Sequence, residues 1–258
     1  MLELTNICKT FNPGDINEEK IFDGVSLKVN KGDFICIIGS NGAGKSTLLN
    51  LISGKIGADR GRIVLDNSNI TNEPENQRCK KVSRIFQDPS LGTIPSMTIR
   101  ENLSMALNKG KKFDFSFLVN KKDENFFRDT LKTLDLGLED KLEVTVSKLS
   151  GGQRQSLALI MSTLTDPSLL LLDEHTAALD PKTSEIVMDI TDRIIKEKNL
   201  TALMVTHNID HAIKYGNRLI MMHRGQIIMD VSEKEKTSLT KEKLLSLFKD
   251  VSDRSLFS

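Results

Sequence analysis

A glycine-rich segment that ends in a lysine and two hydroxyl residues is the first part of this chain whose residue types could perform chemistry. Residues 39–47 read Gly-Ser-Asn-Gly-Ala-Gly-Lys-Ser-Thr and fit the pattern G-x-x-x-x-G-K-[ST] without a mismatch. Glycines let a backbone close around oxygen atoms, and successive N–H groups at a helix start present positive partial charge to a phosphate. The residues expected to bind phosphate are Gly39, Ser40, Asn41, Gly42, Ala43, Gly44, Lys45, Ser46 and Thr47.

Two side chains of this segment have distinct expected roles. Lys45 would reach the β- and γ-phosphates of a nucleotide, and Ser46 would offer a hard oxygen to Mg²⁺. The alternative is a glycine-rich turn that only permits a tight corner between a strand and a helix. The apolar run at residues 34–38 ahead of the segment and the lysine at its helix start favour the phosphate site.

An acidic pair ends a second apolar run. Four leucines at 169–172 are followed by Asp173 and Glu174. Asp173 would hold Mg²⁺ directly or through water, and Glu174 is a candidate base for an attacking water. Two acids at a strand end can also be there simply because they are well solvated. The phosphate-binding segment upstream favours the functional interpretation.

Buried strands and helices must alternate to position these residues. The apolar runs at 34–38, 169–172 and 201–206 read as buried strands, and helical patterns follow the first two. Such alternation predicts an α/β core with a parallel sheet covered on both faces. Short alternating strands precede it, and a mostly helical insertion, containing a capping-box pattern at 98–101, is expected near 88–148.

The bulk composition indicates a soluble, cytoplasmic protein. The chain has 36 basic and 35 acidic residues, so charge gives no reason to expect a nucleic-acid or membrane-surface partner. The longest aliphatic run is far shorter than the roughly 18 residues that cross a bilayer. No secretory signal is visible at the start, and three widely spaced cysteines are typical of reduced thiols.

The segment Leu149-Ser150-Gly151-Gly152-Gln153, together with these motifs, resembles the ATP-binding-cassette (ABC) ATPases, and the resemblance covers about residues 2–230. The segment stands about twenty residues before the acidic pair, as in that family, and would open a second anion-binding helix terminus. In ABC proteins two copies meet head to tail, so that each ATP lies between the phosphate loop of one and this signature of the other. The signature residues are Ser150, Gly151, Gly152 and Gln153.

The resemblance also implies a fold: a P-loop NTPase (RecA-like) α/β core with a parallel sheet, an N-terminal antiparallel β subdomain and an inserted α-helical subdomain. In this chain it implies a single ABC ATPase domain over 1–258. The core would occupy about 1–87 and 149–230, the helical subdomain about 88–148, and a C-terminal helix about 235–250.

Four further residues match the family pattern. Gln87 is similar to the glutamine that senses Mg²⁺ beside the helical lobe, and His207 to the switch histidine that contacts the γ-phosphate. Asp180 ends a segment, residues 178–180, that resembles the loop through which two ATP sites communicate in the family. It is also a plausible plain N-cap. Phe11 stands where the family places an aromatic ring on adenine. A surface glutamine, an inert histidine and a small core aromatic are the alternatives. The resemblance thus implies ATP and Mg²⁺ as ligands.

Three functions remain open on this resemblance: the energy subunit of a transporter, a soluble ATPase of iron–sulfur cluster assembly, and a DNA-repair or translation ATPase. A single cassette without sustained heptads or a basic stripe disfavours the third. The segments at 12–20, 86–103 and 173–181 resemble the ATPase of a bacterial uptake system for tryptophan, tyrosine or related amino acids. The implied partners are membrane permease subunits, a lipoprotein receptor and a second copy of the chain, at the cytoplasmic face of the membrane.

Overall fold

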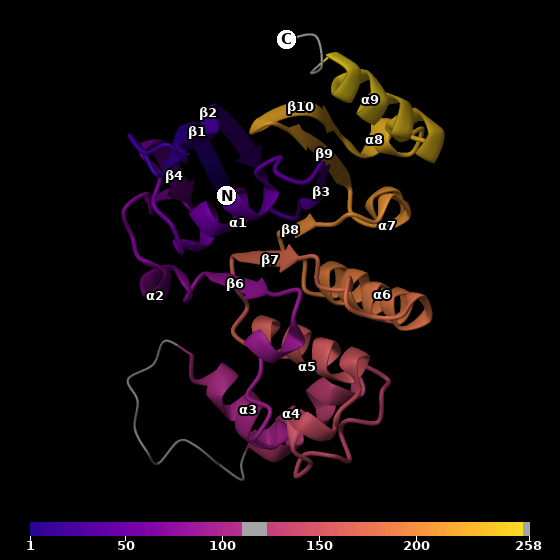
Figure 1. Cartoon of the computed structure of the whole chain (residues 1–258). Helices are drawn as coiled ribbons and strands as arrows, with labels where there is room; N and C mark the ends of the chain where they lie inside the picture. Colours follow the sequence, from indigo (N-terminus) through magenta and orange to yellow (C-terminus); the bar gives the residue numbers. More distant parts are fainter. Residues whose placement is uncertain (110–122, 255–258) are drawn as a thin grey trace. The chain divides into compact units, whose positions relative to one another are not determined.

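The computed structural model describes residues 1–109 and 123–254 (Figure 1). The chain forms two compact units. The first comprises Met1–Arg78 and Thr201–Ser258, and the second comprises Cys79–Leu200.

An antiparallel sheet occupies the N-terminal part of the first unit. Its strands lie in the order β2-β1-β4-β5 and all its pairings are antiparallel. Leu2 and Leu4 are buried while the intervening Glu3 is exposed, as the two-residue period of a half-covered sheet requires. The strands are β1 (Leu2–Phe11), β2 (Glu19–Val29), β4 (Arg60–Leu65) and β5 (Ser68–Asn69).

The remaining strands of the first unit contain two of the three predicted buried runs, 34–38 and 201–206. β3 pairs in parallel with both β8 and β9, and β10 pairs antiparallel with β9. Every residue of β3 and β8 is buried, which explains why their sequences are continuously apolar. These strands are β3 (Phe34–Gly39), β8 (Ala202–Val205), β9 (Arg218–His223) and β10 (Gln226–Val231).

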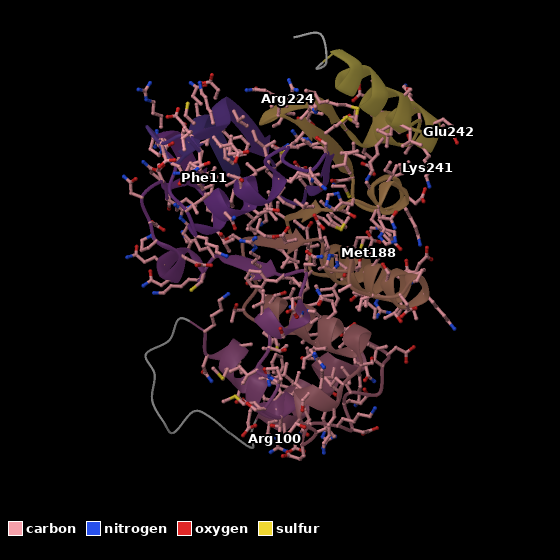
Figure 2. All side chains as sticks on the ribbon, viewed as in Figure 1. Phe11, Arg100, Met188, Arg224, Lys241 and Glu242 are labelled. Atoms are coloured by element: carbon pink, nitrogen blue, oxygen red, sulfur yellow. The ribbon has the colours of Figure 1, made fainter. Side chains whose placement is uncertain are left out.

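The helices of the first unit pack on these strands. Helix α1 contacts β3, α7 contacts β3 and α9, and α8 contacts β9 and β10. In place of one helix over about 235–250, the chain forms α8 and then α9, because Thr240 accepts a hydrogen bond from the Lys243 N–H and starts a new helix. Lys241 at the start of α9 pairs with Asp210 of α7 at 2.6 Å (Figure 2). The helices are α1 (Lys45–Ser53), α2 (Glu75–Arg78), α7 (Ile209–Lys214), α8 (Glu233–Lys236) and α9 (Lys241–Arg254).

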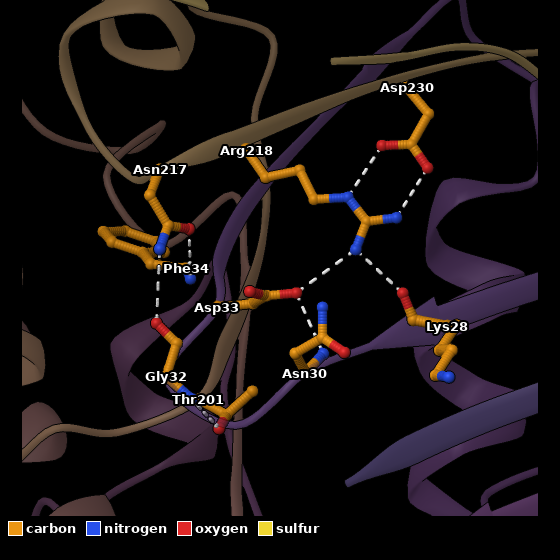
Figure 3. A network of polar contacts seen from close by, with 9 residues as sticks. All are labelled: Lys28, Asn30, Gly32, Asp33, Phe34, Thr201, Asn217, Arg218 and Asp230. Atoms are coloured by element: carbon orange, nitrogen blue, oxygen red, sulfur yellow. Dashed lines mark hydrogen bonds and ion pairs between the residues drawn. The ribbon is translucent and has the colours of Figure 1, made fainter. Parts of the chain in front are cut away.

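An arginine ties four strand ends of the first unit together at the amino end of β3 (Figure 3). Arg218 donates both Nε and Nη2 to the carboxylate of Asp230, at 2.7 and 2.6 Å. Its Nη1 donates to Asp33 Oδ2 and to the Lys28 carbonyl. These hydrogen bonds, chiefly those that Arg218 donates to Asp230, raise the pKa of Arg218. The network holds β3 in register with its neighbours at the end opposite to the predicted phosphate loop.

The second unit contains one parallel strand pair and a group of helices. β6 pairs with β7, and α5 contacts β6, α3, α4 and α6. The predicted capping box at the start of α3 is confirmed, since Thr98 and Glu101 exchange both hydrogen bonds. Helix α4 also lies within the predicted helical insertion, whereas residues 110–122 of that insertion lie outside the described residues. The elements are β6 (Val82–Ile85), β7 (Leu169–Asp173), η1 (Pro89–Leu91), α3 (Ile99–Leu107), α4 (Glu124–Lys132), η4 (Val146–Lys148), α5 (Gly151–Thr163) and α6 (Pro181–Glu197).

The strands and helices confirm the predicted α/β class, with a sheet that contains parallel pairings and a separate antiparallel sheet. Over residues 1–109 and 123–254, no helix has both the length and the apolar character needed to cross a bilayer.

Candidate functional site

The predicted phosphate-binding segment connects buried β3 to α1. Gly44 is the N-cap of α1 and adopts a left-handed conformation with φ 95°. A Cβ atom at Gly44 would lie 2.7 Å from Cε1 of Phe22, so both the backbone angle and the ring exclude any larger residue. The first N–H groups of α1 have no intrahelical acceptor, and they point out of the helix start toward the loop. This is the arrangement that binds phosphate oxygens.

Lys45 curls back over the loop. Its Nζ donates to the carbonyls of Gly39 and Ser40, at 2.8 and 3.0 Å, and the residue is buried. The next residue, Ser46, is exposed. The ammonium is therefore held at the loop itself, where it can exchange carbonyl oxygens for phosphate oxygens with little rearrangement of the backbone.

His207 belongs to the same edge of the sheet as the phosphate loop. In the parallel pairing of β3 and β8, Val205 lies opposite Ile37, two residues before Gly39. His207 follows Val205 by two residues, and its side chain is exposed. Since the carboxyl ends of parallel strands meet at one edge, the first unit brings the loop and His207 to that edge.

Phe11 is the last residue of β1, and its ring is half-buried (Figure 2). The ammonium of Lys9 lies 5.6 Å from the ring centroid. Phe11 is thus outside the fully buried core, which argues against its being a simple core aromatic. The ring is presented at the end of a strand with a cation nearby.

The acidic pair lies at the end of β7. The four leucines before it are fully buried, and Asp173 is the last residue of the strand. Its Oδ2 accepts a hydrogen bond from Nη2 of Arg84 at 2.5 Å, across the strand pair. Glu174 then adopts a left-handed conformation with φ 49°, and its carbonyl accepts from the Ala177 N–H at 2.9 Å. The chain therefore turns sharply just where the two carboxylates stand.

Gln87 lies at the same end of the β6–β7 pair as the acidic residues. Ile85 of β6 is opposite Leu172 of β7, so Gln87 follows β6 as Glu174 follows β7. Gln87 is exposed. Asp88 then caps η1 by accepting from the Ser90 N–H, and that hydrogen bond lowers the pKa of Asp88.

The signature segment and Asp180 meet at the starts of two helices. Ser150 caps α5, and it forms a capping box with Gln153 through hydrogen bonds of 3.3 and 3.2 Å. A Cβ atom at Gly152 would lie only 2.3 Å from Cγ2 of Thr183, so α5 approaches α6 closely because residue 152 is glycine. Asp180 accepts from the Thr183 N–H at 3.1 Å, which confirms its predicted N-cap. Hydrogen bonds from the side chain and then the backbone of Thr183 lower the pKa of Asp180.

Comparison with known proteins decides the family. The model of the family described as ABC transporter matches residues 22–177. The chain belongs to the ABC transporter family. It is 55% identical over 250 residues to the tyrosine transport ATP-binding protein of Clostridioides difficile (strain R20291), covering 96% of this chain and 98% of that protein. It is 34% identical to the probable branched-chain amino acid transport ATP-binding protein LivG of Methanocaldococcus jannaschii, covering 96% of each chain.

Solved ABC cassettes have the same fold as this one. A structure of the ADP conformation of the cassette MJ1267 aligns with a TM-score of 0.77 at 30% identity, over 92% of this chain and 93% of that one. A dimeric post-hydrolysis structure of the cassette MJ0796, bound to ADP and Pi, aligns with a TM-score of 0.75 at 28% identity, over 90% and 99%. The enzymatic activity of this cassette is accordingly ATP hydrolysis.

The side chains of Ser46, in the first unit, and Asp173, in the second, carry oxygen atoms of the kind that Mg²⁺ binds in proteins. Within residues 1–109 and 123–254, no group of three or more His, Cys, Asp or Glu side chains could form a protein cage for a metal. Ser46 and Asp173 each offer hard oxygen, and Mg²⁺ normally takes its remaining ligands from water and phosphates.

Two buried polar residues near the acidic pair escaped the sequence reasoning. Arg84 sits within β6 between buried neighbours, and a charge inside a buried strand signals a buried partner, although not which one. His175 is buried, with its Nε2 3.2 Å from the hydroxyl of Thr191 on α6. The Thr191 hydroxyl donates to the Val187 carbonyl, so His175 is the donor in this pair.

A groove of about 360 Å³ opens in the second unit beside β6. We call it the Phe86 groove. Its rim includes Leu91, which is 66% exposed, and Met105, which is 39% exposed. Exposed large apolar side chains around a hollow are typical of a protein-binding surface. It is lined by Ser83, Arg84, Phe86, Leu91, Gly92, Thr93, Ile94, Asn102, Met105, Ala106, Lys109, Ala158, Met161 and Ser162.

Proposed function

We propose that this cassette is the ATP-hydrolysing subunit of a bacterial importer for tyrosine, tryptophan or related amino acids. The observation that carries the proposal is the 55% identity, over nearly the whole of both chains, to a tyrosine transport ATP-binding protein. The similarity to a branched-chain amino acid transport ATP-binding protein over 96% of the chain supports the same substrate class.

In this proposal the phosphate loop binds the phosphates of ATP. The N–H groups of residues 39–47 and the ammonium of Lys45 take the phosphate oxygens, and Phe11 stacks on the adenine. The support is the open helix start of α1 and the lysine already held at the loop by carbonyl oxygens. His207, exposed at the same sheet edge, contacts the γ-phosphate.

The acidic pair and its neighbours act on the metal and the attacking water. Ser46, Asp173 and Gln87 would hold Mg²⁺ directly or through water, and the metal would neutralise charge on the phosphate oxygens. Glu174 accepts the proton of the attacking water, a role that requires a carboxylate beside the metal-binding residue. The left-handed backbone at Glu174 supports this role, because the chain turns directly after the strand that ends at Asp173.

A second copy of the chain completes each ATP site. The capped start of α5, with Ser150 and Gly151 exposed, offers N–H groups and a hydroxyl to the γ-phosphate of ATP bound by the other copy. Asp180 lies near that helix start, because it caps the helix whose Thr183 packs against Gly152. In this position Asp180 would communicate between the two ATP sites of the dimer. The dimeric form of the cassette MJ0796 supports such an assembly.

The Phe86 groove receives a helix of the membrane permease. The exposed apolar side chains of Leu91 and Met105 suit an amphipathic segment, and the lining includes Phe86, which precedes Gln87. The cassette would then lie peripherally on the cytoplasmic face of the membrane. A lipoprotein receptor would deliver the amino acid from outside.

The experiment is purification of tagged protein from its native cells in a gentle detergent, followed by identification of the chains that come with it. We expect a multi-span permease and a lipoprotein. Leu91→Asp is the matched variant: the side chain is largely exposed, so the fold should persist while the permease is lost.

A different outcome would redirect the proposal. Soluble scaffold proteins with no membrane partner would contradict transport and favour an ATPase of iron–sulfur cluster assembly. If the permease and lipoprotein are found, binding assays of the lipoprotein with single amino acids identify the substrate.

A further inference from the structure

Arg84 is a charged residue held inside a buried strand pair. Its neighbours Ser83 and Ile85 are each 2% exposed, and it lies opposite Leu171 in the β6–β7 register. The side chain of Arg84 is 9% exposed and that of Asp173 is 16% exposed. A cation beside a partly buried carboxylate compensates the hydration that both groups lose.

We infer that Arg84 is a stand-in counter-ion for Mg²⁺: it pairs with the Asp173 carboxylate and orients it while the cassette lacks metal, and it loses part of this contact when metal binds. The inference rests on the proposed role of Asp173 in holding Mg²⁺. Arg84 contacts Oδ2 at 2.5 Å, which leaves Oδ1 for the metal or its water. Two cations beside one carboxylate repel each other, so metal binding must weaken the ion pair.

The guanidinium of Arg84 has a second stabilising contact, which remains when its ion pair with Asp173 weakens. Its Cζ lies 5.0 Å from the ring centroid of Phe86, within the range of a cation–π interaction. Arg84 and Phe86 both line the Phe86 groove. A segment that fills this groove would therefore touch the same arginine that pairs with Asp173. Arg84 is a positioning residue for the Asp173 carboxylate.

The test measures how much Mg²⁺ adds to thermal stability. Wild type and Arg84→Met are unfolded with a non-hydrolysable ATP analogue, once with EDTA and once with Mg²⁺. Because the variant lacks the stand-in cation, Mg²⁺ should bind it more tightly, and the Mg²⁺-dependent rise in Tm should exceed that of wild type by about 2–4 °C. Without metal, the variant should melt at a lower temperature than wild type.

Arg100→Met is the matched control. Arg100 also forms ion pairs in the second unit, with Glu124 at 3.1 Å and with Glu143, and its side chain is 15% exposed (Figure 2). It is expected to lower Tm equally with and without Mg²⁺. Arg84→Gln, which removes the charge but keeps a donor, should behave as Arg84→Met, whereas Arg84→Lys should stay near wild type.

Other results overturn the inference. An unchanged Mg²⁺ increment in both Arg84→Met and Arg84→Gln would make the pair purely structural, and a smaller increment would mean that Arg84 assists metal binding. If wild type itself gains nothing from nucleotide and Mg²⁺, the proposed function fails, and this inference fails with it.

Discussion

At the residue scale, the conformation of Glu174 is the least ordinary feature of the acidic pair. A residue other than glycine in the left-handed region costs about 1–2 kcal/mol, and such strain is kept where the surroundings impose it. At Glu174 the buried strand β7 on one side and the Ala177 hydrogen bond on the other impose it. The strained backbone would serve catalysis if it directs the Glu174 carboxylate to the attacking water and away from the metal.

Glu174→Gln tests that use directly. The amide has the same size and keeps the turn, but it does not accept a proton, so the variant should bind ATP while hydrolysing it at least about 100-fold more slowly. Phosphate release and nucleotide binding are the two measurements. Glu185→Gln, on the exposed face of α6, is the control and should keep wild-type turnover. Near-normal turnover of Glu174→Gln would remove Glu174 from its proposed role.

At the element scale, one arginine secures the helix that begins with Lys45. The guanidinium of Arg78, in α2, is buried and donates to the carbonyls of Leu51 and Ile52 in the last turn of α1. It also donates to the carbonyls of Thr71 and Glu73. Burial lowers the pKa of Arg78. The charge is nevertheless well placed, since a helix C-terminus attracts cations.

Arg78→Met should therefore destabilise the protein markedly. It leaves several buried carbonyl groups without a donor, a loss of at least about 2 kcal/mol. For a chain of this size that corresponds to a fall in Tm of roughly 4–8 °C. Urea and thermal unfolding measure it, with Arg62→Met on the exposed side of β4 as control. Equal stability of the two variants would show that the carbonyl groups find other partners.

The cap at Thr98 could be predicted from the sequence, whereas the ion pair of Arg84 could not. Local signals were sufficient for the buried apolar strands, the glycine loop, and the caps at Thr98 and Asp180, because the atoms involved are within a few residues. Arg84 and Asp173 are 89 positions apart, and Arg78 bonds to Leu51 across 27 positions. Such contacts are set by the fold, so no spacing in the sequence revealed them. The break between α8 and α9 was missed for a smaller reason, since both flanking segments are good helix formers.

At the scale of the whole molecule, the phosphate loop at residues 39–47 and the signature at residues 149–153 each occur once in the sequence. The proposed function therefore requires two copies of the chain, so that the loop of each copy faces the signature of the other. ATP bound at the loop of one copy would draw in the signature of the other, and hydrolysis would release it. The Phe86 groove would pass that cycle to a permease. The identity of 55% to a tyrosine transport ATP-binding protein is the ground for naming the cargo.

The most direct test of this account is uptake of labelled tyrosine and tryptophan by proteoliposomes that contain the cassette with its co-purified permease and receptor. The account predicts uptake that requires ATP on the cassette side and that is lost when the cassette carries Glu174→Gln. Uptake at the same rate with Glu174→Gln, or ATP hydrolysis with no transport of any amino acid, would contradict it.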